Sequence, residues 1–90
     1  MNKLEDWCLI DINSPLDYLP PEAADIYFVG KVYGHSFHED GTRIVTAQIT
    51  SFSNGKFYTF SGTEYELGVP SKQYEDEYPN AKKRIENALA

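Results

Sequence analysis

The chain has 90 residues, enough for one domain of ordinary size but with little room for a second. Hydrophobic residues make up 41% and charged residues 24% of it, which excludes wholesale disorder. The single cysteine, Cys8, excludes an internal disulfide framework and a cysteine-based zinc cluster. The sequence has neither an apolar run of membrane-spanning length nor a signal peptide, so we expect a soluble cytoplasmic protein without a membrane partner.

Negative charge is concentrated at the start of the chain. The net charge is −6, and residues 1–40 hold eight acids and two bases, whereas residues 41–90 hold six of each. A field of one sign attracts cationic partners and repels nucleic acid, although such acids also keep a small protein soluble. We therefore predict an acidic partner-binding surface and no direct binding of nucleic acid. Its candidate residues are Glu5, Asp6, Asp11, Asp17, Glu22 and Asp25.

The first segment predicts a strand followed by a short turn of helix. Residues 7–12 alternate in the manner of a strand. Ser14, Pro15 and Asp17 have the order of a capping serine, a first-turn proline and an acid, which predicts one helical turn. The prolines at 20–21 end that turn, and the connection that follows is rich in proline and acids.

The middle of the chain predicts two longer strands around a polar loop. Residues 26–33 are rich in β-branched and aromatic side chains, and Gly30 within them indicates a bulge or a close backbone approach. The loop of residues 34–41 contains both histidines. Residues 42–52 give the longest strand signal and lead into Asn54-Gly55, which predicts a hairpin turn because both turn residues need positive φ.

A two-residue turn fixes the register of this hairpin, so Phe52 is expected opposite Phe57 and Ile49 opposite Phe60. One face of the hairpin is then expected to be core. It comprises Val45, Ala47, Ile49, Tyr58 and Phe60. The other face is expected to carry a stripe of hydroxyl and amide groups. That polar stripe comprises Thr46, Gln48, Thr50, Thr59 and Ser61.

The last third predicts one strand and two helical segments. Residues 63–67 alternate so that Tyr65 and Leu67 face inward. Ser71 can cap a short helix, which Pro79 ends. A final helix has an apolar face that we expect to pack on the open side of the sheet. This face comprises Ala81, Ile85, Ala88 and Leu89.

These elements predict an α+β, mainly β, fold in a single domain of residues 1–90. The sheet is expected to be small, bent and antiparallel, an SH3-like or OB-like half-barrel of about five strands with a C-terminal helix. Residues 1–25 form the acidic N-terminal strand and proline-rich connection, residues 26–68 a β-meander, and residues 71–90 the C-terminal helix.

Signals for catalysis are weak. His35 and His38, beside Glu39 and Asp40, have metal-ligand chemistry, but a pair three residues apart in a loop is not held at a fixed separation. Cys8 has apolar neighbours, which favours a buried thiol over a nucleophile, and there is no glycine-rich phosphate loop. We expect no enzyme activity, cofactor or metal, and a metal-dependent hydrolase at the two histidines is the minority hypothesis.

Residues 30–68 contain a pattern of short motifs. These are Gly30-Lys31-Val32-Tyr33-Gly34-His35, Phe37, Asp40-Gly41-Thr42, Ile44, Thr46, Thr59-Phe60-Ser61-Gly62-Thr63 and Tyr65-Glu66-Leu67-Gly68. The pattern resembles one in small uncharacterised bacterial and phage proteins. This resemblance carries no established activity. It implies an accessory protein of a mobile element, and such proteins often bind and block a host factor or sequester a signal.

We therefore predict a non-catalytic binding protein, a phage or mobile-element counter-defence protein that blocks a host protein with a basic surface. Its acids, together with its seven tyrosines, would form the contact surface, because tyrosine is enriched at interfaces. The alternative is a sponge that sequesters a small nucleotide ligand at an oligomer interface. Its candidate ligand-binding residues are His35, Arg43, Thr46, Gln48, Thr50, Thr59 and Ser61.

The polar-stripe face also carries three apolar side chains, Ile44, Phe52 and Phe57. Exposed apolar patches mark interfaces, and two-fold dimers are the commonest oligomers, so we predict a homodimer through these residues. The alternative is that the N-terminal strand and Trp7 cover this face within one chain.

Overall fold

The computed structural model describes residues 2–89, apart from the side chains of residues 15 and 16. It confirms an α+β, mainly β, fold with a bent sheet and a C-terminal helix. The elements in chain order are β1 (Asn2–Asp11), β2 (Ser14–Tyr18), β3 (Phe28–Tyr33), β4 (Thr42–Val45), β5 (Ile49–Ser53), β6 (Lys56–Thr59), β7 (Glu64–Leu67), α1 (Lys72–Glu77) and α2 (Ala81–Leu89).

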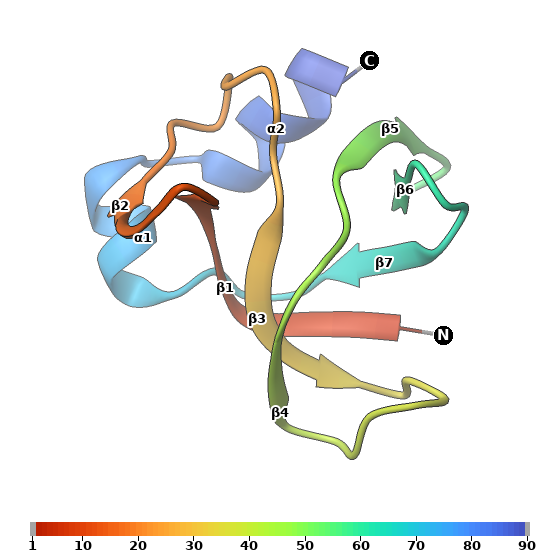
Figure 1. The fold of residues 1–90 in the computed structure, drawn as a ribbon. Coiled ribbons are helices and arrows are strands. Elements are labelled where there is room, and N and C mark those ends of the chain that lie inside the picture. Colours follow the sequence, from red (N-terminus) through yellow and green to blue (C-terminus); the bar gives the residue numbers. More distant parts are fainter. Residues whose placement is uncertain (1, 90) are drawn as a thin grey trace.

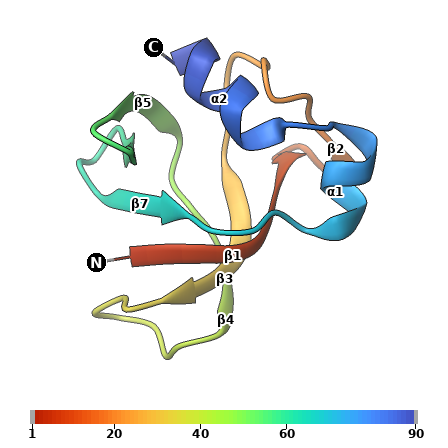
Figure 2. The same cartoon turned by 180° about the vertical axis from the view of Figure 1, so that it is seen from behind.

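The strands form one curved sheet in the order β4-β3-β1-β7-β6-β5, with β2 paired to β1 beside this path. The pairs are antiparallel except β1 and β7, which run parallel and lie side by side in Figures 1 and 2. A bridge joins Ile26, just before β3, to Ile49 of β5, and the Ile49 N–H donates to the Ile26 carbonyl at 2.9 Å. The sheet therefore curls back toward its own far edge.

Within residues 2–89 the sheet has seven strands rather than about five. The predicted strand of residues 42–52 is interrupted at residues 46–48, which separates β4 from β5. The predicted helical turn at Ser14 is wrong, because residues 14–18 form β2, in which Tyr18 pairs with Ile10 of β1. A single helical turn is unfavourable because it fixes several backbone dihedral angles and forms only one hydrogen bond. Pairing with β1 instead adds hydrogen bonds to a sheet that already exists.

A bulge in β1 brings Trp7, Cys8 and Leu9 into the core one after another. Asp6 stands at the bulge with φ of 52°, and the register against β3 shifts there, so simple alternation ends. Gly30 of β3 lies against this bulge, where a Cβ would be 3.0 Å from the Trp7 Cβ. The close backbone approach predicted at Gly30 is confirmed.

The β5–β6 hairpin has the predicted turn but not the predicted faces. Asn54 and Gly55 have φ of 53° and 79°, and Phe52 pairs with Phe57. A register shift between Ile49 and Ser51 then places Ile49 opposite Thr59 instead of Phe60. One extra residue in a strand reverses which side chains face inward.

The predicted core face of this hairpin is therefore wrong in most of its members. Val45 and Phe60 are 53% and 72% exposed, Ala47 is exposed and Tyr58 is half-buried, whereas Ile49 is buried. The prediction for residues 63–67 is confirmed, because Tyr65 and Leu67 of β7 are buried. No bulge interrupts β7, so simple alternation holds there.

The two helices lie together at one end of the sheet (Figure 1). Ser71 caps α1 as predicted, and its Oγ accepts a hydrogen bond from the Tyr74 N–H at 3.2 Å. In α2, Ala81 and Ile85 are buried and Leu89 packs on the core, but Ala88 is exposed, contrary to the predicted apolar face. α2 contacts β5 without covering Val45 or Phe60.

Sheet and helices share one core. Trp7 is fully buried, with its ring 5.8 Å from that of Phe28 and 6.0 Å from that of Tyr74 of α1. Phe28 in turn stands edge-on to Phe57 of β6, at 5.3 Å between ring centroids. Since these aromatic contacts connect β1, β3, β6 and α1, the helices are part of the domain rather than an appendage.

Candidate functional site

Two of the six N-terminal acids are held by the fold itself. The Glu5 carboxylate accepts a hydrogen bond from the Val69 N–H at 2.7 Å, which holds the pKa of Glu5 below its ordinary value. Glu22 binds Arg84 of α2 through both oxygens, at 2.6 and 2.8 Å, and this bond lowers the pKa of Glu22 and raises the pKa of Arg84. These carboxylates tie distant segments together.

The other four acids make looser contacts. Asp6 lies 3.8 Å from the Lys31 ammonium, and Asp17 accepts a hydrogen bond from the Ser14 hydroxyl at 2.9 Å. Asp11 accepts from the Asn13 N–H at 2.9 Å, and Asp25 accepts from the Gln48 amide at 3.0 Å. Each of these acceptors retains lone pairs for a partner outside the chain.

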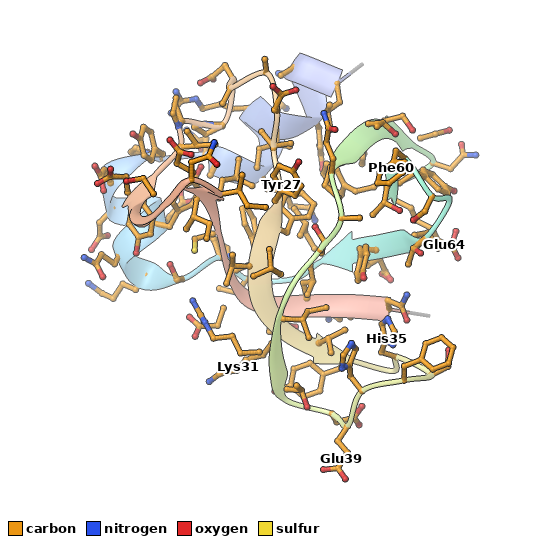
Figure 3. All side chains as sticks on the ribbon, in the orientation of Figure 1. Tyr27, Lys31, His35, Glu39, Phe60 and Glu64 are labelled. Atoms are coloured by element: carbon orange, nitrogen blue, oxygen red, sulfur yellow. The ribbon has the colours of Figure 1, made fainter. Side chains whose placement is uncertain are left out.

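Asp11 and Asp25 line the same groove, which we call the acidic groove. It has a volume of about 520 Å³ and lies between the end of β1 and the connection to β3. Its lining residues are Asp11, Ile12, Asn13, Leu19, Ala23, Ala24, Asp25, Tyr27 and Gln48. Ile12 is half exposed there, and Tyr27 is labelled in Figure 3. Two carboxylates beside an apolar wall suit a cationic group on an aliphatic stem, as in lysine or arginine.

The predicted polar stripe is not an exposed surface. Thr46 and Thr59 are 5% and 4% exposed. The Thr46 hydroxyl accepts from the Phe28 N–H at 3.1 Å and donates to the Ala47 carbonyl at 2.8 Å, while the Thr59 hydroxyl accepts from the Thr63 N–H at 3.1 Å. Both hydroxyls are used within the fold. Thr46 joins the end of β4 to Phe28 of β3, and Thr59, which lies opposite Ile49 after the register shift in β5, holds the turn after β6.

The remaining candidate ligand residues are dispersed. Gln48 lies in the acidic groove, His35 is in the loop after β3, and Arg43 is exposed on β4. Thr50 and Ser61 are exposed on β5 and in the turn after β6. Of these five side chains, Gln48 alone lines the acidic groove.

The apolar patch that was predicted to form a homodimer is not exposed, so that prediction is also wrong. Phe57 is fully buried, and Phe52 and Ile44 are half-buried against the core. The ring of Phe52 packs on that of Phe57 at 4.7 Å. Phe28 of β3 also stands edge-on to Phe57, and Trp7 packs on Phe28.

The two histidines are tied to their own loop. Their ring centroids are 4.7 Å apart, and His35 Nδ1 accepts a hydrogen bond from the Phe37 N–H at 3.0 Å. Burial and His38 lower the pKa of His35, which favours the neutral ring that this bond needs. Glu39 points away from His35 (Figure 3). Within residues 2–89, no three His, Cys, Asp or Glu side chains form a group that could hold a metal ion.

The remaining candidates have mainly structural roles. Cys8 is 3% exposed, and burial raises the pKa of its thiol, so the reactive thiolate is disfavoured. Tyr65 and Tyr74 are core residues, and burial raises the pKa of both hydroxyls. The Tyr74 hydroxyl donates to the Leu19 carbonyl at 2.6 Å. Of the predicted tyrosine surface, Tyr33 is 38% exposed, and four tyrosines are half-buried: Tyr18, Tyr27, Tyr58 and Tyr78.

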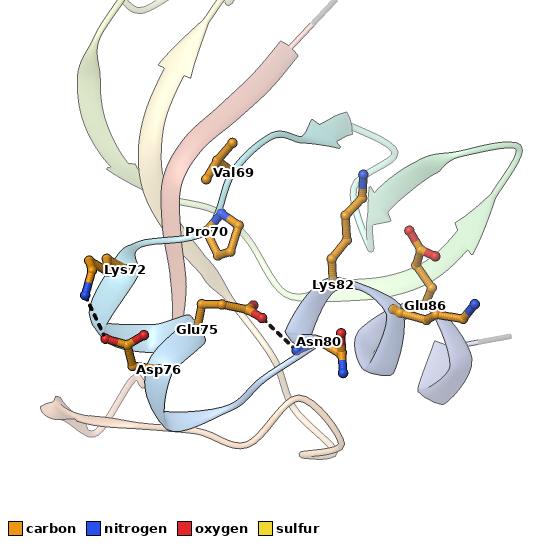
Figure 4. A pocket seen from close by; sticks show the side chains of 9 residues that line it. Val69, Pro70, Lys72, Glu75, Asp76, Asn80, Lys82 and Glu86 are labelled. Carbon is orange, nitrogen blue, oxygen red and sulfur yellow. Dashed lines mark hydrogen bonds and ion pairs between the residues drawn. The ribbon is translucent and has the colours of Figure 1, made fainter.

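A second groove, about 690 Å³, lies between α1, α2 and the segment after β7 (Figure 4), and sequence patterns did not indicate it. We call it the helix groove. Its lining residues are Val69, Pro70, Lys72, Glu75, Asp76, Asn80, Lys82, Lys83 and Glu86. Lys72 pairs with Asp76 at 3.2 Å, and Glu75 accepts from the Asn80 N–H at 2.7 Å. Within residues 2–89, Lys82 and Lys83 form no ion pair.

Comparisons with known proteins give no relative whose function could be carried over to this chain. The chain matches no family model, no curated protein and no solved structure. In the described residues, neither helix has the length and apolar character needed to cross a membrane.

Proposed function

We propose that this protein is a non-catalytic binding protein whose acidic groove engages a basic surface of another protein and blocks it. The observation that carries the proposal is the convergence of Asp11 and Asp25 on one groove with the apolar side chains of Ile12 and Tyr27. The two acids are 14 positions apart in sequence. The fold brings them together where the chain turns from β1 through β2 toward β3.

The charge distribution supports a cationic partner. The negative excess of the whole chain lies in residues 1–40, which supply eight of the nine groove-lining residues. Such a field attracts a basic surface over distances near a Debye length, about 8–10 Å at ordinary ionic strength. A basic surface of this kind commonly serves nucleic acid, so its occupation by this protein would act as inhibition, and the partner is proposed to be a host protein opposed by a phage or mobile element.

The test uses the purified chain as bait in a bacterial lysate, followed by binding measurements with the captured protein across a salt series. We expect a basic partner whose affinity falls steeply with salt. Asp11→Asn combined with Asp25→Asn should weaken binding by at least about tenfold, since two charge-assisted contacts are lost.

The matched control is Glu77→Gln, which removes an exposed carboxylate of α1 outside both grooves. It should leave the affinity nearly unchanged. Recovery of only acidic or neutral proteins, or a complex indifferent to salt and to the double substitution, would contradict the proposal.

A further inference from the structure

The acidic groove differs from the helix groove in the sign of its charges. Its charged lining residues are Asp11 and Asp25, and the segment of residues 4–30, which supplies most of the lining, contains no lysine or arginine. The helix groove instead mixes three lysines with three acids. Charge complementarity therefore selects a cationic occupant for the acidic groove and none for the helix groove.

The hydrogen-bond acceptors of the acidic groove come from three separate segments. Asp11 ends β1, Asp25 lies in the connection before β3, and Gln48 lies between β4 and β5. The Asn13 N–H donates to Asp11 Oδ1 at 2.9 Å, and Gln48 Nε2 donates to Asp25 Oδ1 at 3.0 Å. These two bonds orient the carboxylates. The second oxygen of each acid, together with Gln48 Oε1, is left as an acceptor for an occupant.

Acceptors supplied by three segments favour a guanidinium over an ammonium. The guanidinium of arginine carries five N–H donors in one plane, whereas the donors of lysine share one nitrogen. The guanidinium is also less strongly hydrated, so its transfer onto an apolar wall costs less. Tyr27, half-buried in the lining and labelled in Figure 3, supplies an aromatic ring on which a guanidinium can stack.

The apolar wall of the acidic groove is held in place by the fold. The Leu19 N–H donates to the Leu9 carbonyl at 3.0 Å, and the Leu19 carbonyl accepts from the Tyr74 hydroxyl at 2.6 Å. Leu19 and Ala23 both pack against the core. A wall that is already ordered loses little conformational entropy on binding, and the aliphatic stem of an arginine can lie along it.

We propose that the acidic groove is a pocket for one arginine side chain of the partner protein, with its guanidinium bonded to Asp11 and Asp25 and stacked on Tyr27. The aliphatic stem lies on Leu19 and Ala23. This assignment rests on the proposed function and adds to it the residue type that the groove selects. A lysine in the same place keeps the charge but loses the planar set of donors and the stacking, so it binds more weakly.

Titration with blocked tripeptides, Gly-Arg-Gly and Gly-Lys-Gly, tests this selection without the partner protein. The backbone amide chemical shifts of Asn13 and Gln48 report binding in the groove. We expect the dissociation constant of the arginine peptide to be at least about fivefold lower than that of the lysine peptide. A peptide with dimethylated arginine keeps the charge but blocks paired hydrogen bonding, so it should also bind more weakly than the arginine peptide.

Substitutions in the groove separate the charge from the ring. Asp11→Asn combined with Asp25→Asn should weaken both peptides by at least about tenfold. Tyr27→Leu keeps both acids and an apolar contact, so it should reduce the preference for arginine by about threefold or more and change lysine binding little. Glu77→Gln, outside the groove, is the control and should change neither affinity. Unchanged Trp7 fluorescence verifies that the variants fold.

Equal affinities for the arginine and lysine peptides, no saturable shift of the groove amides, or a preference that survives Tyr27→Leu would each overturn the assignment. The proposed function can fail separately. Selective arginine binding without any captured basic protein would support the arginine pocket alone. A captured basic protein that needs Asp11 and Asp25 but accepts lysine in place of its contacting arginine would support the proposed function and overturn the arginine pocket.

Discussion

Gly30 lacks a side chain at the point where β3 lies closest to the bulge in β1. A Cβ at this position would lie 3.0 Å from both the Glu5 carbonyl oxygen and the Trp7 Cβ, and neither backbone-anchored atom can move aside cheaply. Gly30→Ala is therefore expected to lower the free energy of unfolding by about 1–3 kcal/mol, the usual cost of overpacking. Urea denaturation followed by Trp7 fluorescence measures this. Ser51→Ala, at an exposed position of β5, is the control and should differ little from wild type.

His35 makes the order of its loop dependent on pH. The titratable groups packed against its ring are His38 and Tyr65. Because the folded protein lowers the pKa of His35 below 6.5, the neutral ring is favoured and stabilises the loop above that pH. This contribution is lost as the pH falls through the folded pKa. We expect weaker protection of the Phe37 amide from hydrogen exchange in mild acid, beyond the intrinsic pH effect.

Two substitutions isolate the histidine responsible. His35→Asn supplies an acceptor that does not titrate and should remove the pH dependence of Phe37 protection. His38→Asn leaves the bond from the Phe37 N–H to His35 in place, so the pH dependence should persist. Equal behaviour of the two variants would show that His35 does not control the loop.

At the scale of single elements, the sequence predicted the features that depend only on neighbouring residues. The Asn54-Gly55 turn, the Ser71 cap and the inward side chains of β7 were all predictable, because each depends on a few adjacent residues. The bulges in β1 and β5 were not predictable. The bulge in β1 arises where β1 pairs with β3, a strand distant in sequence, and the register shift in β5 begins at Ile49, which also bridges to Ile26. The shift at residue 50 places Thr59 opposite the buried Ile49, and Thr46 is buried separately, where the chain leaves β4 and bonds to Phe28. Together these two changes remove the predicted polar stripe.

The start of α2 depends on a side chain of α1. Glu75 accepts hydrogen bonds from the Asn80 N–H at 2.7 Å and from the Ala81 N–H at 3.4 Å, as a capping residue does. Glu75→Ala is expected to lower the free energy of unfolding by about 0.5–2 kcal/mol, the range for a lost cap. Thermal denaturation followed by circular dichroism measures it. Glu77→Ala, an exposed carboxylate on the same helix, should have a clearly smaller effect.

At the scale of the whole molecule, both grooves depend on contacts between distant segments. The negative excess of residues 1–40 was visible in the sequence, but the pairing of Asp11 with Asp25 in one groove required the path of the chain through β2. The helix groove likewise requires the segment after β7, with Val69 and Pro70, to lie beside both helices. Glu5 holds that segment by accepting the Val69 N–H, a contact across 64 positions that no local pattern indicates.

The core couples the helices to the sheet, so the chain should unfold as one unit. Ile85 of α2 is fully buried in the cluster that contains Trp7. Ile85→Ala is expected to lower the free energy of unfolding by about 2–4 kcal/mol, because it removes transfer energy and leaves a cavity. Trp7 fluorescence and far-ultraviolet circular dichroism should report the same urea midpoint, before and after the substitution. Ala88→Ser, on the exposed side of α2, is the control. If helical signal were lost in a separate earlier transition while Trp7 stayed buried, α2 would be an independent unit and the single core would be refuted.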